Sequence, residues 1–170
     1  MSATPSLSTA PDSELLSGVI GRIQSAAETS SPITGNDLSL AAFHHHFSKP
    51  GKCMRAQLCL HASRALGQSE QNAHSFAATV ESLHNASLVL DDLQDGTLTR
   101  RGQASVCAQF GTDAALALTL QLTSASFLCL SESRSEVFAQ LSAQTHFAVS
   151  ETAMGQARDL TGGIMLRLTS

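Results

Sequence analysis

The stretch LHNASLVLDDLQDG, residues 83–96, is the most informative part of the chain, because an apolar segment runs directly into three aspartates. From about Ser69 onward the chain keeps helical spacing, with apolar side chains on nearly every side, as is typical of a helix in a core. Gly96 is a natural C-terminal stop for such a helix. We therefore predict one long core helix over about residues 69–95, with three carboxylates at its C-terminal end.

Helical patterns also occur on both sides of this segment. No proline follows Pro50, so long helices can run without interruption, and alternation of apolar and polar residues never persists long enough to predict a strand. We predict five further helices, at about residues 14–28, 38–47, 52–66, 102–130 and 135–160. The predicted fold class is therefore all-α, with about six helices.

The composition narrows the classes of function. With 170 residues, the chain is long enough for one domain with a sizeable core, and its net charge of −4 argues against general nucleic-acid binding. No apolar run reaches the roughly 18 residues of a membrane span. Four cysteines without a CxxC pair indicate reduced thiols in a cytoplasmic protein. The Ser-, Thr- and Pro-rich start predicts a disordered tail over residues 1–12.

The three aspartates indicate a metal site. Asp91 and Asp95 are four residues apart and stack on one face of the predicted helix, with Asp92 beside them. His84 lies two turns earlier on the same stripe. Carboxylates at the end of a buried helix cost free energy unless they are paired or bind a cation, and hard oxygen ligands suit Mg²⁺. The alternative is a solvated acidic helix end that forms salt bridges with the arginines that follow it.

Two basic groups accompany the aspartates. Arg100 and Arg101 follow within a few residues, and guanidinium groups suit phosphate oxygens. Lys52 and Arg55 lie three residues apart at a predicted helix start, where free backbone N–H groups also favour an anion. The alternative for this second group is an ordinary solvated basic turn. Two anion sites and one metal site together indicate two diphosphate substrates.

Four motifs, in order along the chain, resemble those of the trans-isoprenyl diphosphate synthases, or polyprenyl synthetases. GKCMR at 51–55 is similar to the family's GKxxR, and ESLHNASLVLDDLQD at 81–95 to its ExxHxxSLxxDDxxD. RRGQASVCAQFG at 100–111 is similar to RRGxPxxxxxxG, and GQARDL at 155–160 to a GQxxDL helix. The matched segments span most of the part of the chain that we expect to be ordered.

The resemblance implies a truncated helical bundle of the isoprenoid-synthase type around a partial apolar cavity. It implies a partial polyprenyl synthetase domain over residues 13–165, followed by a short tail at 166–170. In this family an allylic diphosphate ionises with the help of Mg²⁺. The double bond of isopentenyl diphosphate then attacks the carbocation, and a proton is lost. The expected function is therefore that of a prenyltransferase in isoprenoid biosynthesis.

Roles for individual residues follow from the same resemblance. The expected catalytic residues hold magnesium on the allylic diphosphate or contact that diphosphate directly: Asp91, Asp92, Asp95 and Arg100. The three aspartates among them are the expected metal ligands. The residues expected to bind isopentenyl diphosphate are Lys52, Arg55, His84 and Arg101. Gln156 and Asp159 are expected to support the opposite wall of the site, with Gln156 as a further substrate-binding residue.

The residues just before the aspartates bear on product length. In the family, bulky side chains at these positions limit the growing prenyl chain, whereas this chain has Asn85, Ala86 and Ser87. Ser87 lies one turn below Asp91 on the same face, where a growing chain would descend. We therefore expect Ala86 and Ser87 to leave room for a product longer than fifteen carbons. The alternative is that other side chains close the cavity.

The chain also departs from the family pattern. It is about half the length of the family's catalytic domain and carries no second aspartate-rich motif, and Ala56 follows Arg55 where the family usually has proline. The expected partners, besides the two diphosphates, are a second copy of the chain or a complete synthase. The alternative to an enzyme is a catalytically silent subunit that binds a complete synthase and alters its product length. A third alternative is a degenerate helical fragment.

Three consecutive histidines, His44, His45 and His46, form the remaining unusual feature. Adjacent residues of a helix point in different directions, so we do not expect these side chains to share a metal ion.

Overall fold

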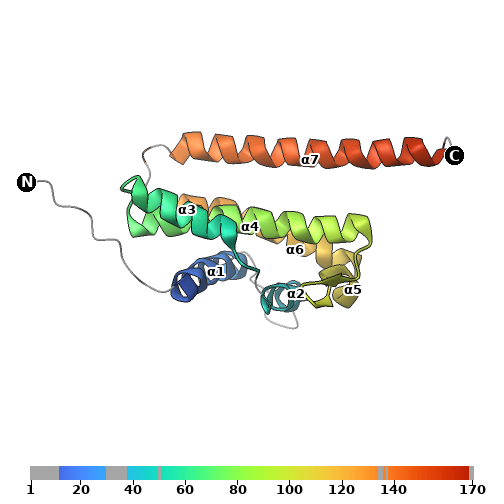
Figure 1. Cartoon of the computed structure of the whole chain (residues 1–170), viewed down its shortest axis with the longest axis horizontal. Coiled ribbons are helices and arrows are strands. Elements are labelled where there is room, and N and C mark those ends of the chain that lie inside the picture. The colour runs from blue at the N-terminus through green and yellow to red at the C-terminus, as the bar shows by residue number, and fades with distance from the viewer. Residues whose placement is uncertain (1–11, 30–37, 50, 134–135, 137, 169–170) are drawn as a thin grey trace, which may run out of the picture. The chain divides into compact units, whose positions relative to one another are not determined.

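The computed structural model describes residues 12–29, 38–49, 51–133, 136 and 138–168, with side chains described between residues 16 and 159. The described residues form seven helices and two short strands (Figure 1). The elements are α1 (Asp12–Thr29), α2 (Leu38–Phe47), α3 (Met54–Ala65), α4 (Glu70–Asp95), β1 (Thr99–Arg100), β2 (Gln103–Ala104), α5 (Val106–Phe110), α6 (Thr112–Ser131) and α7 (Phe138–Leu168). The predicted all-α class is confirmed. The predicted tail at 1–12 lies, up to residue 11, outside the described residues.

Two compact units make up the chain, and they divide after Arg134. The first contains α1 to α6 and the hairpin of β1 and β2, and the second contains α7. Each unit is described by itself below.

Helix α4 is the central element of the first unit (Figure 1). It begins at its N-cap Ser69, whose hydroxyl accepts a hydrogen bond from the Asn72 N–H at 3.2 Å. It ends at Gly96, whose φ of 64° is left-handed and therefore favours glycine. Helix α6 packs along it, and α1 and α3 pack on its other sides. The prediction of one long core helix over 69–95 is confirmed.

Small and hydroxyl-bearing side chains bring α4 and α6 close together. The Ser82 hydroxyl of α4 donates to the Leu122 carbonyl of α6 at 2.7 Å, and the Thr79 hydroxyl donates to the Ser126 carbonyl at 3.2 Å. The largest apolar side chains that are fully buried around this pair are Phe43, Ile23, Leu60, Leu118 and Leu122. Burial of each contributes about 1.5–3 kcal/mol, so this contact area is the main core of the unit.

The segment after α4 differs from the prediction of a single helix over 102–130. Arg100 pairs with Gln103, and the two residues between them, Arg101 and Gly102, both have positive φ (52° and 73°). This is the backbone of a tight two-residue hairpin turn. Strands of two residues are too short to leave an alternating pattern, which is why the sequence did not predict them. A short α5 follows, and Gly111, with a φ of 88°, separates it from α6.

Helix α6 is also notable for its length and apolar composition. Its 20 residues are apolar enough, by length and composition alone, to cross a membrane. In this structure Leu118, Leu122 and Cys129 on α6 are fully buried in the core of the first unit. Core helices of soluble proteins pass the same test, so the length and composition of α6 are weak evidence for a membrane span.

Helix α7 is longer than predicted. The expected end near Leu160, before Gly162 and Gly163, is wrong, because the backbone stays helical to Leu168. Glycine in a helix costs only about 1 kcal/mol relative to alanine and keeps its N–H donor, so a glycine pair does not by itself end a helix. Residues 166–168 of the predicted C-terminal tail are therefore part of this helix.

Candidate active site

The aspartates at the end of α4 divide into two groups. Asp92 points into the protein and is 2% exposed, and its two carboxylate oxygens accept hydrogen bonds from Arg100 Nε at 2.6 Å and Nη2 at 2.7 Å. Asp91 is half-buried and Asp95 is exposed. The carboxylate of Asp92 raises the pKa of Arg100, so this arginine stays charged. The acidic helix end is thus partly neutralised by the β-hairpin that follows it.

Asp91 and Asp95 are the two carboxylates that fit a magnesium ion best. They are one helical turn apart on the same face of α4, and Mg²⁺ usually takes one or two carboxylates together with substrate phosphates. Within the described ranges, no group of three His, Cys, Asp or Glu side chains is gathered as a metal site. The predicted role of Asp92 as a third ligand stays a prediction, because Arg100 holds both of its oxygens in this structure.

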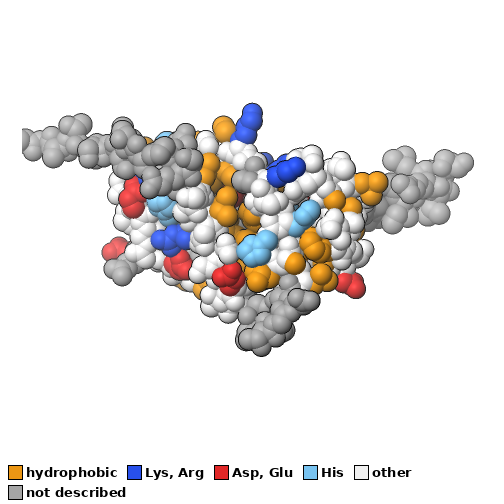
Figure 2. Space-filling model, turned by 90° about the horizontal axis from the view of Figure 1, so that it is seen from below, with side chains coloured by type: hydrophobic (Ala, Val, Ile, Leu, Met, Phe, Trp, Pro, Cys, Tyr) orange, Lys and Arg blue, Asp and Glu red, His pale blue; other side chains and the backbone are white. Residues whose placement is uncertain are grey.

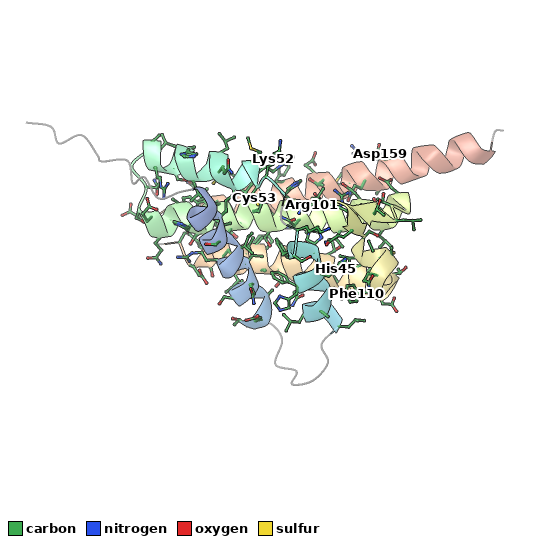
Figure 3. All side chains as sticks on the ribbon, turned by 60° about the horizontal axis from the view of Figure 1, so that its bottom comes forward. His45, Lys52, Cys53, Arg101, Phe110 and Asp159 are labelled. Carbon is green, nitrogen blue, oxygen red and sulfur yellow. The ribbon has the colours of Figure 1, made fainter. Side chains whose placement is uncertain are left out.

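The C-terminal end of α2 holds the hairpin of β1 and β2 in place. We refer to it as the arginine hairpin, because it carries Arg100 and Arg101. Gln103 Nε2 donates to the His45 carbonyl at 2.8 Å, and His45 Nε2 donates to the Ala104 carbonyl at 2.8 Å. Lys49 Nζ donates to the Gly102 carbonyl at 3.2 Å. The ring of His45 also packs edge-on against Phe110, with centroids 5.3 Å apart (Figure 3). These contacts determine where Arg100 and Arg101 lie.

Arg101 lies against the loop that carries the second basic group. Its Nη1 donates to the Lys49 carbonyl at 3.2 Å, and a Cβ atom on Gly51 would be 2.9 Å from Arg101 Nη2. Only glycine at position 51 therefore allows this close approach. Figure 3 shows Arg101 near Lys52 and Cys53 at the start of α3. Lys52 is exposed beside it.

Arg55 and His84 complete this second basic group. Arg55 Nη1 and His84 Nε2 are 3.2 Å apart. A guanidinium can only donate, so His84 Nε2 accepts this hydrogen bond. Burial, and then the charge of Arg55, lower the pKa of His84. His84 lies two turns before Asp91, or about 10 Å along the axis of α4 at roughly 1.5 Å per residue. The structure thus brings together the four residues predicted to bind isopentenyl diphosphate.

A small pocket lies where these parts meet. Side chains of α2, α4 and the hairpin line it, including His45, His46, Asp92, Arg100 and Arg101. On the neighbouring face, which α1 and α2 help to form, acidic, basic and histidine side chains are interspersed with hydrophobic ones (Figure 2). Arg100 and Arg101 thus lie at the pocket, and Lys52 and Arg55 lie at the start of α3.

Comparison with known proteins identifies the family. Residues 36–168 match the model of the polyprenyl synthetase family. The chain belongs to this family.

Three similar proteins show how far the match extends. The geranylgeranyl pyrophosphate synthase 10, mitochondrial, of Arabidopsis thaliana is 30% identical over 151 residues, which cover 82% of this chain and 43% of that protein. The geranylfarnesyl diphosphate synthase of Aeropyrum pernix is 33% identical over 135 residues, covering 75% and 42%. The solved structure of the geranylgeranyl pyrophosphate synthetase of the archaeon Geoglobus acetivorans matches with a TM-score of 0.75 at 25% identity, covering 88% and 48%. The chain spans less than half the length of each.

Ala86 and Ser87 are the two residues that were predicted to affect product length. Ala86 is 3% exposed and packs in the core. Ser87 is half-buried, with its hydroxyl donating to the His84 carbonyl at 2.8 Å, and it shares the more open face of α4 with Val80, which is 39% exposed. Of the two, Ser87 lies on the same face of α4 as Asp91, one turn before it. The role of both in product length stays a prediction.

The last polyprenyl synthetase motif lies on α7. Gln156 and Asp159 are three residues apart on this helix and so lie near one side of it. Because α7 forms the second unit, the predicted position of these residues opposite the aspartates stays a prediction.

His45 and His46 line the pocket, although the sequence predicted no role for them in the site. The expectation that the three histidines point in different directions is confirmed, since His44 is exposed, His45 contacts the hairpin and His46 is buried. His46 Nε2 lies 2.9 Å from Asn85 Oδ1, and burial lowers the pKa of His46 to about 4. A signal was present in the spacing of Glu81 and Asn85, which places two polar side chains one turn apart on a core helix.

Proposed function

We propose that this chain supplies part of the active site of a magnesium-dependent prenyltransferase, which condenses an allylic diphosphate with isopentenyl diphosphate. The observation that carries the proposal is the arrangement along α4. A pair of carboxylates, Asp91 and Asp95, lies two turns from a cluster of basic side chains around His84. Such an arrangement suits two diphosphates that must be held end to end.

The first diphosphate belongs at the acidic end of α4. Asp91 and Asp95 would hold magnesium on the allylic diphosphate, and Arg100, oriented by Asp92, would contact its oxygens. Bound there, magnesium supplies positive charge that stabilises the departing diphosphate. Arg100 adds a fixed positive charge on the same leaving group as the C–O bond of the allylic substrate breaks.

The second diphosphate belongs at the basic cluster, by which we mean Lys52, Arg55, His84 and Arg101. Lys52, Arg55 and Arg101 would bind its oxygens, and His84 would orient Arg55. Binding there would bring the double bond of isopentenyl diphosphate near the allylic carbon, so that it could attack the carbocation as it forms. A new C–C bond forms, diphosphate leaves, and a proton is lost to restore the double bond.

The product is proposed to be longer than fifteen carbons. Two relatives are named for geranylgeranyl and geranylfarnesyl products, both of which are longer than farnesyl. The side chains one turn or so before Asp91 are those of Ala86 and Ser87, which are small. A prenyl chain that descends from Asp91 along the open face of α4 therefore meets little bulk at this level.

The alternative function is that of a subunit that binds a complete synthase and changes its product length. The retained pair of Asp92 and Arg100 favours the enzyme, since a silent subunit does not require a positioned guanidinium at the acidic end of α4.

The test measures incorporation of labelled isopentenyl diphosphate with geranyl or farnesyl diphosphate as co-substrate, with and without Mg²⁺. The variant is Asp91→Asn with Asp95→Asn, and the matched control is Asp113→Asn, an exposed aspartate on α6. We expect magnesium-dependent turnover that falls at least about 100-fold in the double variant and is unchanged in the control.

The same assay is repeated with a complete synthase added. A chain that is folded but inactive alone, and that lengthens or shortens the product of the added synthase, would establish the second candidate. A folded chain with no effect in either arm would overturn both candidates.

A further inference from the structure

Three buried polar side chains connect α2, α3 and α4 beneath the basic cluster. His46, Asn85 and Glu81 are 5%, 1% and 2% exposed. His46 Nε2 lies 2.9 Å from Asn85 Oδ1, and Asn85 Nδ2 lies 3.1 Å from Glu81 Oε1. The other carboxylate oxygen of Glu81 accepts from the Ala56 N–H at 3.3 Å. We refer to His46, Asn85 and Glu81 as the buried network.

Only one assignment of donors and acceptors fits the hydrogen bonds of the buried network. Asn85 Nδ2 contacts the Glu81 carbonyl at 2.8 Å as well as its carboxylate, and both of these groups can only accept. The Asn85 oxygen must therefore face His46, whose Nε2 must carry a proton and donate. Neither an aspartate at 85 nor an apolar residue at 46 reproduces this pattern. A buried network with a single hydrogen-bonding pattern specifies one arrangement of the helices that it joins.

At one end, the network determines where α3 begins. Cys53 precedes the helix with a φ of 46°, and its thiol donates to the Gly51 carbonyl at 3.5 Å instead of capping the helix. Glu81, which belongs to α4, accepts from the first turn of α3 in its place. A proline at residue 56 would have no N–H and could not form this bond. Lys52 precedes this turn and Arg55 lies in it, so their positions depend on it.

At the other end, the network holds α2, the helix whose C-terminal end contacts the arginine hairpin. His46 binds Asn85 one residue after His45 and three before Lys49, and both of these residues make hydrogen bonds to the hairpin. The contact of Arg101 with the Lys49 carbonyl completes the connection. A shift of α2 on α4 would therefore move Arg101 relative to Lys52 and Arg55.

We propose that Glu81, Asn85 and His46 are positioning residues, which hold the Arg101 hairpin and the Lys52–Arg55 turn at the spacing that one diphosphate requires. The inference rests on the proposed function, because it assigns isopentenyl diphosphate to the basic cluster. It adds residues that contact no substrate and act through the elements that carry the binding groups.

The experiment measures binding of isopentenyl diphosphate to the purified chain by calorimetry, in the absence of an allylic substrate. Two variants break the network: Glu81→Gln, which removes an acceptor, and His46→Phe, which keeps an aromatic ring and removes the donor. His46→Gln retains a donor at the level of Nε2 and serves as the rescue variant. Thr79→Val is the matched control, because Thr79 is a buried hydroxyl on α4 that donates to α6, away from the cluster.

We expect Glu81→Gln and His46→Phe to raise the dissociation constant about tenfold, a size typical of a lost buried hydrogen bond. His46→Gln should recover most of the affinity, and Thr79→Val should bind like the unchanged chain even if its melting temperature falls as far. Equal affinity in all four folded variants would overturn the inference. So would weakening that follows the melting temperature alone, including that of Thr79→Val.

Failure of the proposed function has a different signature. If the unchanged, folded chain binds no isopentenyl diphosphate, the proposed function and this inference both fall, whereas normal binding with insensitive variants removes the inference only. Should Glu81→Gln not fold, Ala56→Pro tests the same end of the network, because it removes the donor and leaves the carboxylate in place. Unchanged affinity in folded Ala56→Pro would then overturn the role of the α3 contact.

Discussion

At the scale of single residues, the pair of Asp92 and Arg100 shows how a charged site is built at low cost. Asp92 is almost completely buried, and a lone carboxylate there would be strongly unfavourable. Arg100 satisfies both oxygens with a two-point contact, and its side chain remains 28% exposed. The edge of the guanidinium with Nε and Nη2 thus holds the hairpin to the end of α4, while the Nη1 side stays available to a ligand.

We predict that Asp92→Asn lowers the free energy of unfolding by about 2 kcal/mol, because it leaves a partly buried guanidinium without its counter-charge. Urea unfolding measures the loss. The matched control is Glu132→Gln, which breaks the ion pair with Arg22 at 2.6 Å, where both side chains are more than 30% exposed. There we expect less than about 1 kcal/mol. Equal losses in the two variants would contradict this account of Asp92.

Gly51 allows a second prediction at this scale. In Gly51→Ala the new Cβ would meet the tip of the Arg101 side chain, which can move away. The free energy of unfolding should therefore change by less than about 0.5 kcal/mol. The displaced guanidinium should nevertheless weaken binding of isopentenyl diphosphate about tenfold. Calorimetry and urea unfolding on the same sample separate the two effects.

Gly21→Ala is the control for this substitution, because a Cβ at that position of α1 meets open space. It should stabilise the chain by about 0.5–1 kcal/mol and leave binding unchanged. Normal affinity in Gly51→Ala would show that Arg101 does not depend on the close approach at Gly51.

At the scale of elements, the contact of α4 with α6 is the most extensive contact between helices of the first unit. Hydroxyl groups of α4 reach the backbone of α6, and α6 places Leu118 and Leu122 in the core. Close packing of this kind makes the cost of a cavity high. The hydrogen bonds of Thr79 and Ser82 place this contact in the middle of α4, before its acidic end.

We predict that Leu118→Ala lowers the free energy of unfolding by about 2–5 kcal/mol, since the side chain is fully buried. Leu120→Ala, two residues away on the same helix and 71% exposed, makes the same chemical change and should cost less than about 0.5 kcal/mol. Thermal unfolding followed by circular dichroism compares the two. Similar losses would mean that α6 does not pack on α4 through the face described.

At the scale of the whole molecule, the buried histidines connect stability to pH. Burial lowers the pKa of His46 to about 4, and the charges of Arg101 and Arg100 act in the same direction, against Asn85 and Asp92. The pKa of His84 is lowered as well. The unfolded chain therefore binds more protons than the folded chain once the pH falls below about 6.5.

We predict that the stabilisation due to neutral His46 is complete above about pH 6.5 and is lost as the pH falls toward 4. The loss should approach roughly 3 kcal/mol, at about 1.4 kcal/mol for each unit of pKa difference. Urea unfolding at pH 7 and at pH 4.5 measures it. His46→Gln should show a shallower dependence, with the part due to His84 remaining. The same slope in both proteins would exclude His46 as the source.

Most of the local structure of the chain could be predicted from the sequence. The spacing of apolar residues, the stop at Gly96 and the long core helix with its acidic end were all predicted, as was the family. Asp91 and Asp95 share a face because they are four residues apart, whatever surrounds the helix. The exceptions at this level were the hairpin, whose strands are too short to leave a pattern, and the end of α7, where a glycine pair does not break the helix.

The sequence by itself therefore determined the helices, the stripe of His84, Ser87 and Asp91 on α4, and the types of group available for diphosphate binding. Only the tertiary structure decided that Asp92 faces Arg100, that Gly51 receives Arg101, and that His46 binds Asn85 from 39 residues away. The reason is physical. A helix relates residues three and four apart through its own geometry, but contacts between elements depend on the packing of the core, which no short segment contains.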